Sequence, residues 1–181
     1  MTNTEFNSEQ YTQNPYPNIP PIIESLETEY LGNGVTSSVA IAGHPIHPII
    51  VVFPVAFLTG AAGADLGYWL TKDFFWARAS VWLIGLGLVA GVLAALVGML
   101  DFFKVPRVRK RTAGWAHMIV NIAALVLTAI NFWLRLGSPD AIVPVGVIIS
   151  LLVATLLGVG GWYGGELSFR HKIGVIGPNE T

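Results

Sequence analysis

Ser80–Leu100 reads SVWLIGLGLVAGVLAALVGML, a run of 21 residues without Asp, Glu, Lys or Arg. A helix needs about 20 apolar residues to cross the hydrocarbon core of a bilayer. A helix of this length in a soluble core would carry polar residues on one face, whereas this run is apolar all round. The stretch therefore predicts a transmembrane helix.

Three further apolar segments of similar length accompany this run. The four predicted spans are about 48–70, 78–102, 112–135 and 141–165. Because the loops between them are short, consecutive helices run antiparallel. The sequence therefore predicts an all-α polytopic membrane protein whose four transmembrane helices form an up-down-up-down bundle.

The composition supports a membrane location and limits the chemistry. Hydrophobic residues make up 53% of the 181 residues and charged residues 12%, whereas soluble domains carry about 25% charged residues. The mean hydropathy of +0.61 excludes a wholly disordered chain. Since the chain has no Cys, disulfides, thiolate metal sites and covalent c-type haem are excluded. A net charge of −1 indicates no nucleic-acid partner.

The first 42 residues differ from the rest. They hold five Glu, no Lys or Arg, and the Pro-rich stretch NPYPNIPP. We interpret residues 1–42 as a mostly disordered tail without a signal-peptide pattern. The transmembrane domain is then expected to cover residues 43–176, and residues 177–181 form a short C-terminal tail.

Basic residues predict the orientation. An even number of spans places both termini on one side, and seven basic residues share that side: Lys104, Arg107, Arg109, Lys110, Arg111, Arg170 and Lys172. The opposite side holds three: Lys72, Arg78 and Arg135. The positive-inside rule therefore predicts a multi-pass protein of an inner, plasma-type membrane with both termini in the cytoplasm.

All four histidines fall on this predicted cytoplasmic side. Two precede the first helix, one lies about a turn into the third, and one follows the fourth. Two acids end the second and fourth helices at the same side, so each helix contributes to one shallow polar layer. The members of this layer are His44, His47, Asp101, His117, Glu166 and His171.

The segment Gly43–Pro48, GHPIHP, is expected to hold its two imidazoles rigidly. A residue before proline is disfavoured in the helical region, so His44 and His47 are expected to be extended or turn-like. Pro48 suits the first helical position. A stiff turn of this kind suits a ligand site.

Asp65 is a second polar feature. It lies 18 residues after His47 in the predicted first helix, or about 27 Å further along at 1.5 Å per residue. Its expected position is therefore near the opposite end, where Arg78, Arg135 or Asn131 are candidate partners. A structural ion pair is the favoured interpretation, and a proton-relay acid is the alternative.

These features together resemble a known family, the bacterial four-helix membrane proteins grouped as domain of unknown function 2231. The resemblance covers about residues 40–176. It rests on His44–Pro48, Asp65, Gly98–Asp101 (GMLD), Ala116–His117 and Gly164–Val175 (GGELSFRHKIGV). It implies a four-helix membrane fold. Relatives with attached Rieske or cytochrome c domains favour electron transfer.

A cofactor in the polar layer is the first functional hypothesis. In its haem b version, His47 and His117 bind the iron from both sides of the porphyrin, with His44 as a further candidate ligand. Arg107 or Arg111 would then meet the propionates. In its non-haem version, a mixed site binds Fe, Zn or Mn through His44, His47, Asp101, His117, Glu166 and His171.

Two alternatives come from other classes. The chain is either a structural or accessory subunit of a membrane complex, or a small-ion or proton transporter that uses Asp65. Glycine pairs at spacing four, such as Gly87 and Gly91, favour close helix packing and permit a homo-oligomer. An enzyme is less favoured, because the sequence has no GxSxG or HExxH motif.

Overall fold

The computed structural model describes residues 34–137 and 142–174. It begins with a short hairpin of β1 (Ala40–Ile41) and β2 (His44–Pro45), in which Ile41 pairs with His44. Helices α1 (Ile46–Ile50), α2 (Val52–Thr71), α3 (Phe74–Lys104), α4 (Pro106–Arg109), α5 (Thr112–Gly137) and α6 (Val145–Gly165) follow. A π-helical turn, η4 (Glu166–Arg170), extends α6.

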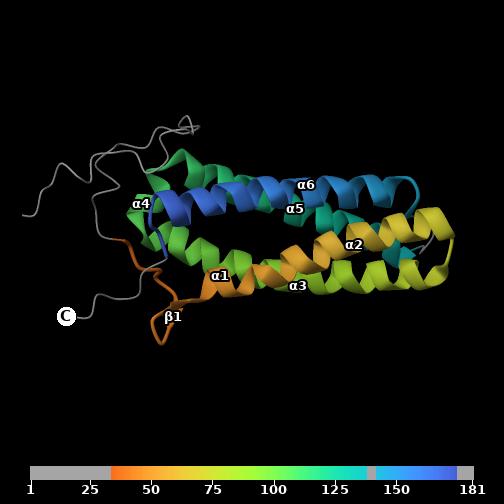
Figure 1. The fold of residues 1–181 in the computed structure, drawn as a ribbon, viewed down its shortest axis with the longest axis horizontal. Helices are drawn as coiled ribbons and strands as arrows, with labels where there is room; N and C mark the ends of the chain where they lie inside the picture. The colour runs from red at the N-terminus through yellow and green to blue at the C-terminus, as the bar shows by residue number, and fades with distance from the viewer. Residues whose placement is uncertain (1–33, 138–141, 175–181) are drawn as a thin grey trace, which may run out of the picture.

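Four long antiparallel helices form the bundle (Figure 1). Helix α2 packs mainly on α3, and α5 mainly on α6, while α2–α6 and α3–α5 contacts complete the ring. Four segments are long and apolar enough to cross a membrane: Ile46–Thr71, Phe74–Lys104, Thr112–Gly137 and Val145–Arg170. Large apolar side chains on the outer surface, such as Leu70, Trp82 and Trp133, are more than 70% exposed. The predicted four-helix membrane bundle is confirmed.

The first span is interrupted at Val51, three residues before Pro54. Pro54 has no N–H to donate to the carbonyl of Ile50, and α1 and α2 are separated at Val51, just after that carbonyl. His44 lies in the extended strand β2, as expected for a residue before proline. For His47 the same expectation is wrong, because His47 lies inside α1. Pro48 there occupies the first helical turn, whose N–H groups have no intrahelical partner.

The ends of the other spans follow local signals. Helix α3 starts four residues before the predicted span because the Asp73 side chain accepts a hydrogen bond from the backbone N–H of Phe75 (2.9 Å). It ends at Lys104, two residues before Pro106. Helix α6 starts at Val145, after Pro144. The start of the predicted fourth span, residue 141, lies outside the described residues.

The N-terminal segment contacts the bundle from residue 35 onward. We call Val35–Val39 the strap. Its first residue forms a parallel bridge with Ile173: the N–H of Val35 donates to the Lys172 carbonyl (2.9 Å), and the N–H of Gly174 donates to the Val35 carbonyl (2.7 Å). Residues 34–42 are therefore structured, in contrast to the predicted tail. The rest of that prediction, residues 1–33, and the predicted C-terminal tail, residues 177–181, lie outside the described residues.

We call the end of the bundle that carries the strap and α4 the α4 end. A cluster of buried apolar side chains fills it, drawn from α3, α4, α5, η4 and the segment after η4. Its members are Phe102, Val105, Val108, Ala113, Leu167 and Ile173. This cluster fixes the positions at which α3 ends, α5 begins and α6 ends.

Candidate functional site: a histidine pair in a cavity at the α4 end

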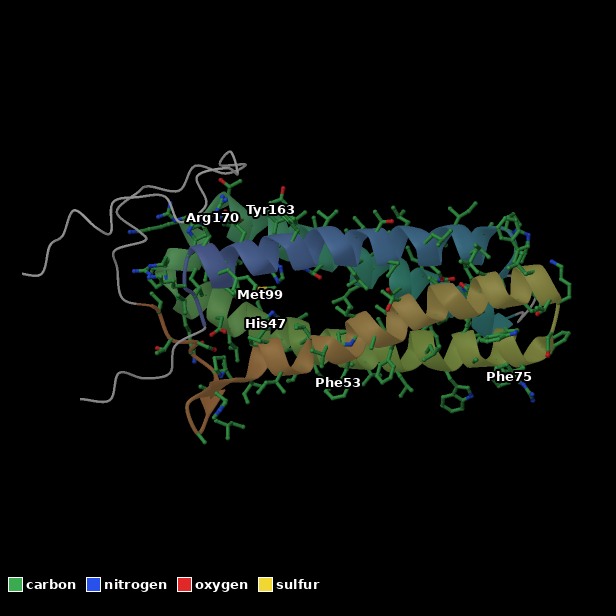
Figure 2. The ribbon with its side chains drawn as sticks, viewed as in Figure 1. His47, Phe53, Phe75, Met99, Tyr163 and Arg170 are labelled. Atoms are coloured by element: carbon green, nitrogen blue, oxygen red, sulfur yellow. The ribbon has the colours of Figure 1, made fainter. Side chains whose placement is uncertain are left out.

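A cavity of about 430 Å³ lies inside the bundle near the α4 end. Figure 2 shows His47 and Met99 in the space between the α1–α3 pair and α6, whereas Phe53 and Phe75 point away from the bundle. The lining is mainly apolar and comes from all four spans. Its polar members are Ser37, His47, Asp101, His117, Asn121 and Ser168.

His47 is held against α3. Its Nδ1 atom lies 3.0 Å from the backbone carbonyl oxygen of Ala94. The ring rests on Gly98, where a Cβ atom would come within 2.7 Å of the His47 Cε1 atom. A larger residue at position 98 would therefore displace the imidazole. This explains why a glycine stands in the GMLD segment.

His117 is held in the same way against α6. Its Nδ1 atom lies 2.8 Å from the backbone carbonyl oxygen of Gly160. The ring lies beside Gly164, where a Cβ would be 3.1 Å from Cε1. Asn121, one turn further along α5, donates from Nδ2 to the His117 carbonyl (2.7 Å). Asn121 and His117, four residues apart, therefore share one face of α5.

These contacts assign the same tautomer to both rings. A carbonyl oxygen can only accept, so each Nδ1 carries the proton and donates it. Each Nε2 then keeps its lone pair, which is the form in which an imidazole binds a metal. The two ring centroids are 6.0 Å apart, and the ring planes are nearly perpendicular at 83°. His47 and His117, which are 70 residues apart in sequence, thus lie side by side with the same tautomer.

The structure places the other predicted ligands differently. Asp101 lines the cavity, but its carboxylate accepts from Ser37 Oγ (2.7 Å), Ser38 N (2.6 Å) and Ser38 Oγ (2.7 Å). It therefore holds the strap against α3. His44 is exposed and contacts the Ala42 carbonyl through Nδ1 (2.8 Å).

Glu166 and His171 form a separate group beyond the cavity. Glu166 pairs with Arg170 at 2.8 Å, one helical turn away. His171 is buried, and its burial lowers its pKa below the usual 6.5; Arg111 lowers it further, Glu166 opposes this, and Arg170 and Arg107 add to the lowering. Arg107 and Arg111 thus lie near His171 and are not among the residues that line the cavity.

Within residues 34–137 and 142–174, no three His, Asp or Glu side chains lie close enough together to hold one metal ion. Of the six residues predicted for a metal site, the structure brings together the pair His47 and His117. Asp101 lines the same cavity but is committed to the strap. Ser37 and Ser38 could not be found from the sequence, because the composition of their segment resembles a linker.

A second polar cluster lies at the opposite end and centres on Asp65. Arg135 NH1 and NH2 donate to the two oxygens of Asp65, each at 2.6 Å, and both side chains are fully buried. Arg135 also donates to Ser80, Asn131 and Ser150, so all five of its N–H groups have acceptors. Of the three candidate partners, Arg135 is the one that pairs with Asp65. The network joins α2, α3, α5 and α6.

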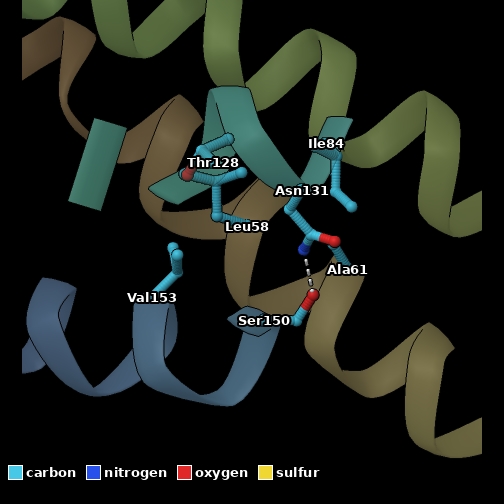
Figure 3. A pocket seen from close by; sticks show the side chains of 7 residues that line it. All are labelled: Leu58, Ala61, Ile84, Thr128, Asn131, Ser150 and Val153. Atoms are coloured by element: carbon cyan, nitrogen blue, oxygen red, sulfur yellow. Dashed lines mark hydrogen bonds between the residues drawn. The ribbon is translucent and has the colours of Figure 1, made fainter. Parts of the chain in front are cut away.

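A small cavity adjoins this network. Figure 3 shows Asn131 Nδ2 donating to Ser150 Oγ at its wall, over 2.8 Å. The cavity volume is about 10 Å³, enough for roughly one water molecule. Leu58 lines both this cavity and the larger one. The two cavities thus share one buried apolar side chain in their walls.

Comparison with known proteins yields one match. The profile of the family described as "Predicted membrane protein (DUF2231)" matches residues 43–177. No curated protein and no solved structure shows significant similarity to the chain.

Proposed function

The chain belongs to the DUF2231 family of predicted membrane proteins, and we propose that it is an electron-transfer protein that holds haem b between His47 and His117. The observation that carries this proposal is the oriented imidazole pair. Both Nδ1 atoms bond to backbone carbonyls, so both Nε2 atoms are available as ligands.

The number of ligands favours haem over a non-haem ion. A non-haem iron, zinc or manganese site draws three or more protein ligands, and the described residues bring together two. A porphyrin supplies four nitrogens itself, so His47 and His117 would suffice as the protein's ligands. His47 and His117, whose ring centroids are 6.0 Å apart, would be the two residues that hold the iron.

The surroundings also suit a large apolar cofactor. A bare ion needs no cavity of about 430 Å³, whereas a porphyrin does. Met99, Met118 and Phe102 are among the apolar lining residues. When bound, haem supplies a one-electron redox centre. The chain's own residues orient the imidazoles, exclude water and set the polarity around the iron.

The distribution of basic residues supports an orientation for this site. The α4 end carries seven basic residues against three at the other end, so we place the α4 end and both termini in the cytoplasm of a cell with an inner membrane. The haem would then lie near the cytoplasmic face. A redox protein or a second copy of the chain is a partner that this placement allows.

The transporter alternative receives less support. Asp65 is fully buried and has both oxygens bonded to Arg135, which is the arrangement of a structural ion pair. Neither Asp65 nor Arg135 lines the larger cavity. The alternative of an accessory subunit does not explain why two imidazoles are held with their Nε2 atoms available as ligands.

The test is a reduced-minus-oxidised visible spectrum of the detergent-purified protein, expressed with ample haem. We expect a sharp Soret band and α-band in the wild-type protein and their loss in His47→Ala and His117→Ala. His44→Ala is the matched control, because His44 is exposed and does not line the cavity. Added imidazole should restore the bands in His117→Ala if the variant is folded. A flat wild-type spectrum would contradict the proposal.

A further inference from the structure

The connection between α3 and α5, which contains α4, is fixed to the bundle by its own residues. Val105 and Val108 belong to the buried cluster of the α4 end and are at most 7% exposed. A Cβ at Gly114, in the first turn of α5, would clash with the Val108 carbonyl oxygen, so α4 packs directly on α5. The Trp115 Nε1 atom donates to the Arg109 carbonyl (3.0 Å). The backbone of this connection is therefore held in one place.

The exposed side chains of the same connection include three cations. Lys104 ends α3, Arg109 ends α4 and Lys110 follows it, and all three are exposed. Among the described residues, the α4 end carries seven basic side chains and two acids, Asp101 and Glu166. Asp101 holds the strap, and Glu166 forms an ion pair within η4. The excess of positive charge on this surface fits an anionic partner.

Two exposed aromatic rings accompany the cations. Phe103 is 59% exposed, and Trp115 is 46% exposed and packs edge to face on Phe102, with ring centroids 4.9 Å apart. Phe103 is the last residue but one of the span Phe74–Lys104, and Trp115 is the fourth residue of the span Thr112–Gly137. Both rings thus lie where a span meets the headgroup layer, a depth that aromatic side chains favour.

We call the surface formed by these five exposed residues the α4 corner; they are Phe103, Lys104, Arg109, Lys110 and Trp115. We propose that the α4 corner binds an anionic phospholipid, whose headgroup phosphate contacts the three cations while its acyl chains lie against the two rings. This inference does not depend on the proposed haem.

Two features favour a lipid over the other uses of a basic loop. Orientation in the membrane requires basic residues in the loop, but it requires no fixed backbone beneath them. A backbone that is fixed before binding reduces the ordering cost of holding a ligand. An acidic soluble protein would use the cations, whereas a phospholipid uses the cations and the exposed rings at the span ends together.

The test measures which lipid contacts Trp115. The full-length protein is placed in phosphatidylcholine vesicles, and brominated phosphatidylglycerol or brominated phosphatidylcholine is added to quench tryptophan fluorescence. The difference between the wild type and Trp115→Phe gives the part that comes from Trp115. Trp133 is the matched reporter, because it lies on the same helix toward the opposite end and is 77% exposed.

We expect phosphatidylglycerol to be favoured over phosphatidylcholine at least about tenfold at Trp115, since each basic residue near an anionic lipid contributes roughly fivefold. We expect no such preference at Trp133. Equal quenching of Trp115 by the two lipids would overturn the proposal and would indicate that an acidic protein segment faces these cations.

A matched pair of double variants tests the role of the cations. Arg109→Gln/Lys110→Gln should reduce the preference at Trp115 at least about fivefold. Lys72→Gln/Arg78→Gln removes two exposed cations from the opposite end and should leave the preference at Trp115 unchanged. A preference that survives Arg109→Gln/Lys110→Gln, or that both double variants reduce equally, would overturn the assignment of the phosphate to the α4 corner.

A second readout does not use fluorescence. A ligand that binds the folded protein raises its melting temperature, so phosphatidylglycerol added in mild detergent should stabilise the wild type more than phosphatidylcholine does. Arg109→Gln/Lys110→Gln should lose this gain, and Lys72→Gln/Arg78→Gln should keep it. Inorganic phosphate at the same concentration should have little effect. An equal gain from inorganic phosphate would show a site for the free ion and would overturn the role of the two rings.

Discussion

The guanidinium group of Arg135 and the carboxylate of Asp65 form a two-point ion pair across 70 residues of sequence, with both N···O distances 2.6 Å. Neither side chain is exposed. The pair holds α5 to α2 at the end of the bundle opposite the histidines. Every N–H of Arg135 has an acceptor. Removing one member of the network would therefore leave a buried polar group without its partner.

Removing one partner of this pair should strongly destabilise the protein. Arg135→Gln leaves the buried Asp65 carboxylate without a counter-charge, so we expect a loss of about 3–5 kcal/mol in the free energy of unfolding. Thermal or denaturant melting in mild detergent measures it. Arg78→Gln is the control, since Arg78 is exposed at the same end. The double variant Asp65→Leu/Arg135→Met should recover much of the loss, and equal effects of Arg78→Gln and Arg135→Gln would contradict this role.

The glycine beneath His47 should be essential for the cofactor. In Gly98→Leu the new side chain takes the space of the imidazole, because a Cβ alone comes within 2.7 Å of Cε1. We expect the ratio of haem to protein, measured by absorbance, to fall close to zero while the protein still inserts. Gly63→Leu in α2 is the matched control, since a Cβ there meets nothing within 4 Å. Full haem content in Gly98→Leu would refute the ligand role of His47 as the structure positions it.

Asp101 should act as the anchor of the strap. Asp101→Ala removes the acceptor of three hydrogen bonds from Ser37 and Ser38. One hydrogen bond to a charged group contributes about 1.5–3 kcal/mol, so hydrogen exchange of residues 35–41 should accelerate at least tenfold. Mass spectrometry of the exchanged peptides measures this.

The control for the strap is Asp73→Ala, which removes an acid that caps α3 at the opposite end. It should leave the exchange of residues 35–41 unchanged. If Asp101→Ala also left the strap unchanged but abolished cofactor binding, Asp101 would be a ligand, as the sequence alone suggested.

His171 should make the α4 end sensitive to acid. Its pKa in the folded protein is below 6.5, mainly through burial and then through Arg111. Between the folded pKa and about 6.5 the unfolded chain therefore binds a proton that the folded chain does not. The contribution of neutral His171 to the free energy of unfolding is therefore complete above about pH 6.5. It is lost as the pH falls from there toward the folded-state pKa.

Melting temperatures in detergent at about pH 7.5 and pH 5.5 test this sign. We expect a lower melting temperature at the acid pH in the wild type and a smaller difference in His171→Gln. His44→Gln removes an exposed imidazole and should keep the full wild-type difference. A protein more stable at pH 5.5 would contradict the assigned direction.

The features that followed from local sequence were predicted well. Length and apolarity located four spans. The pairing of His47 with His117 followed from topology, because both lie near the same end of antiparallel helices. Arg135 was one of three candidates for Asp65, and sequence had no means of choosing among them.

Contacts that depend on how each helix is rotated about its own axis could not be predicted from the sequence. Gly160 and Ala94 act through their carbonyls, which any residue carries, so their identity gives no signal. Ser80 and Ser150 complete the Arg135 network but are ordinary small residues in apolar helices. Asp101 was expected near a metal, and its use by the strap depends on a segment whose composition resembled a linker.

The strap has a consequence for how the molecule is made. Val35 is bridged to Ile173, and Ser37 and Ile173 both line the histidine cavity. The walls of the cavity therefore include residues from both the first and the last parts of the described chain. During synthesis the pocket stays open until the fourth span has been inserted and its end has left the ribosome. Any molecule that the cavity holds therefore meets a complete set of walls only after the segment that follows η4 has been synthesised.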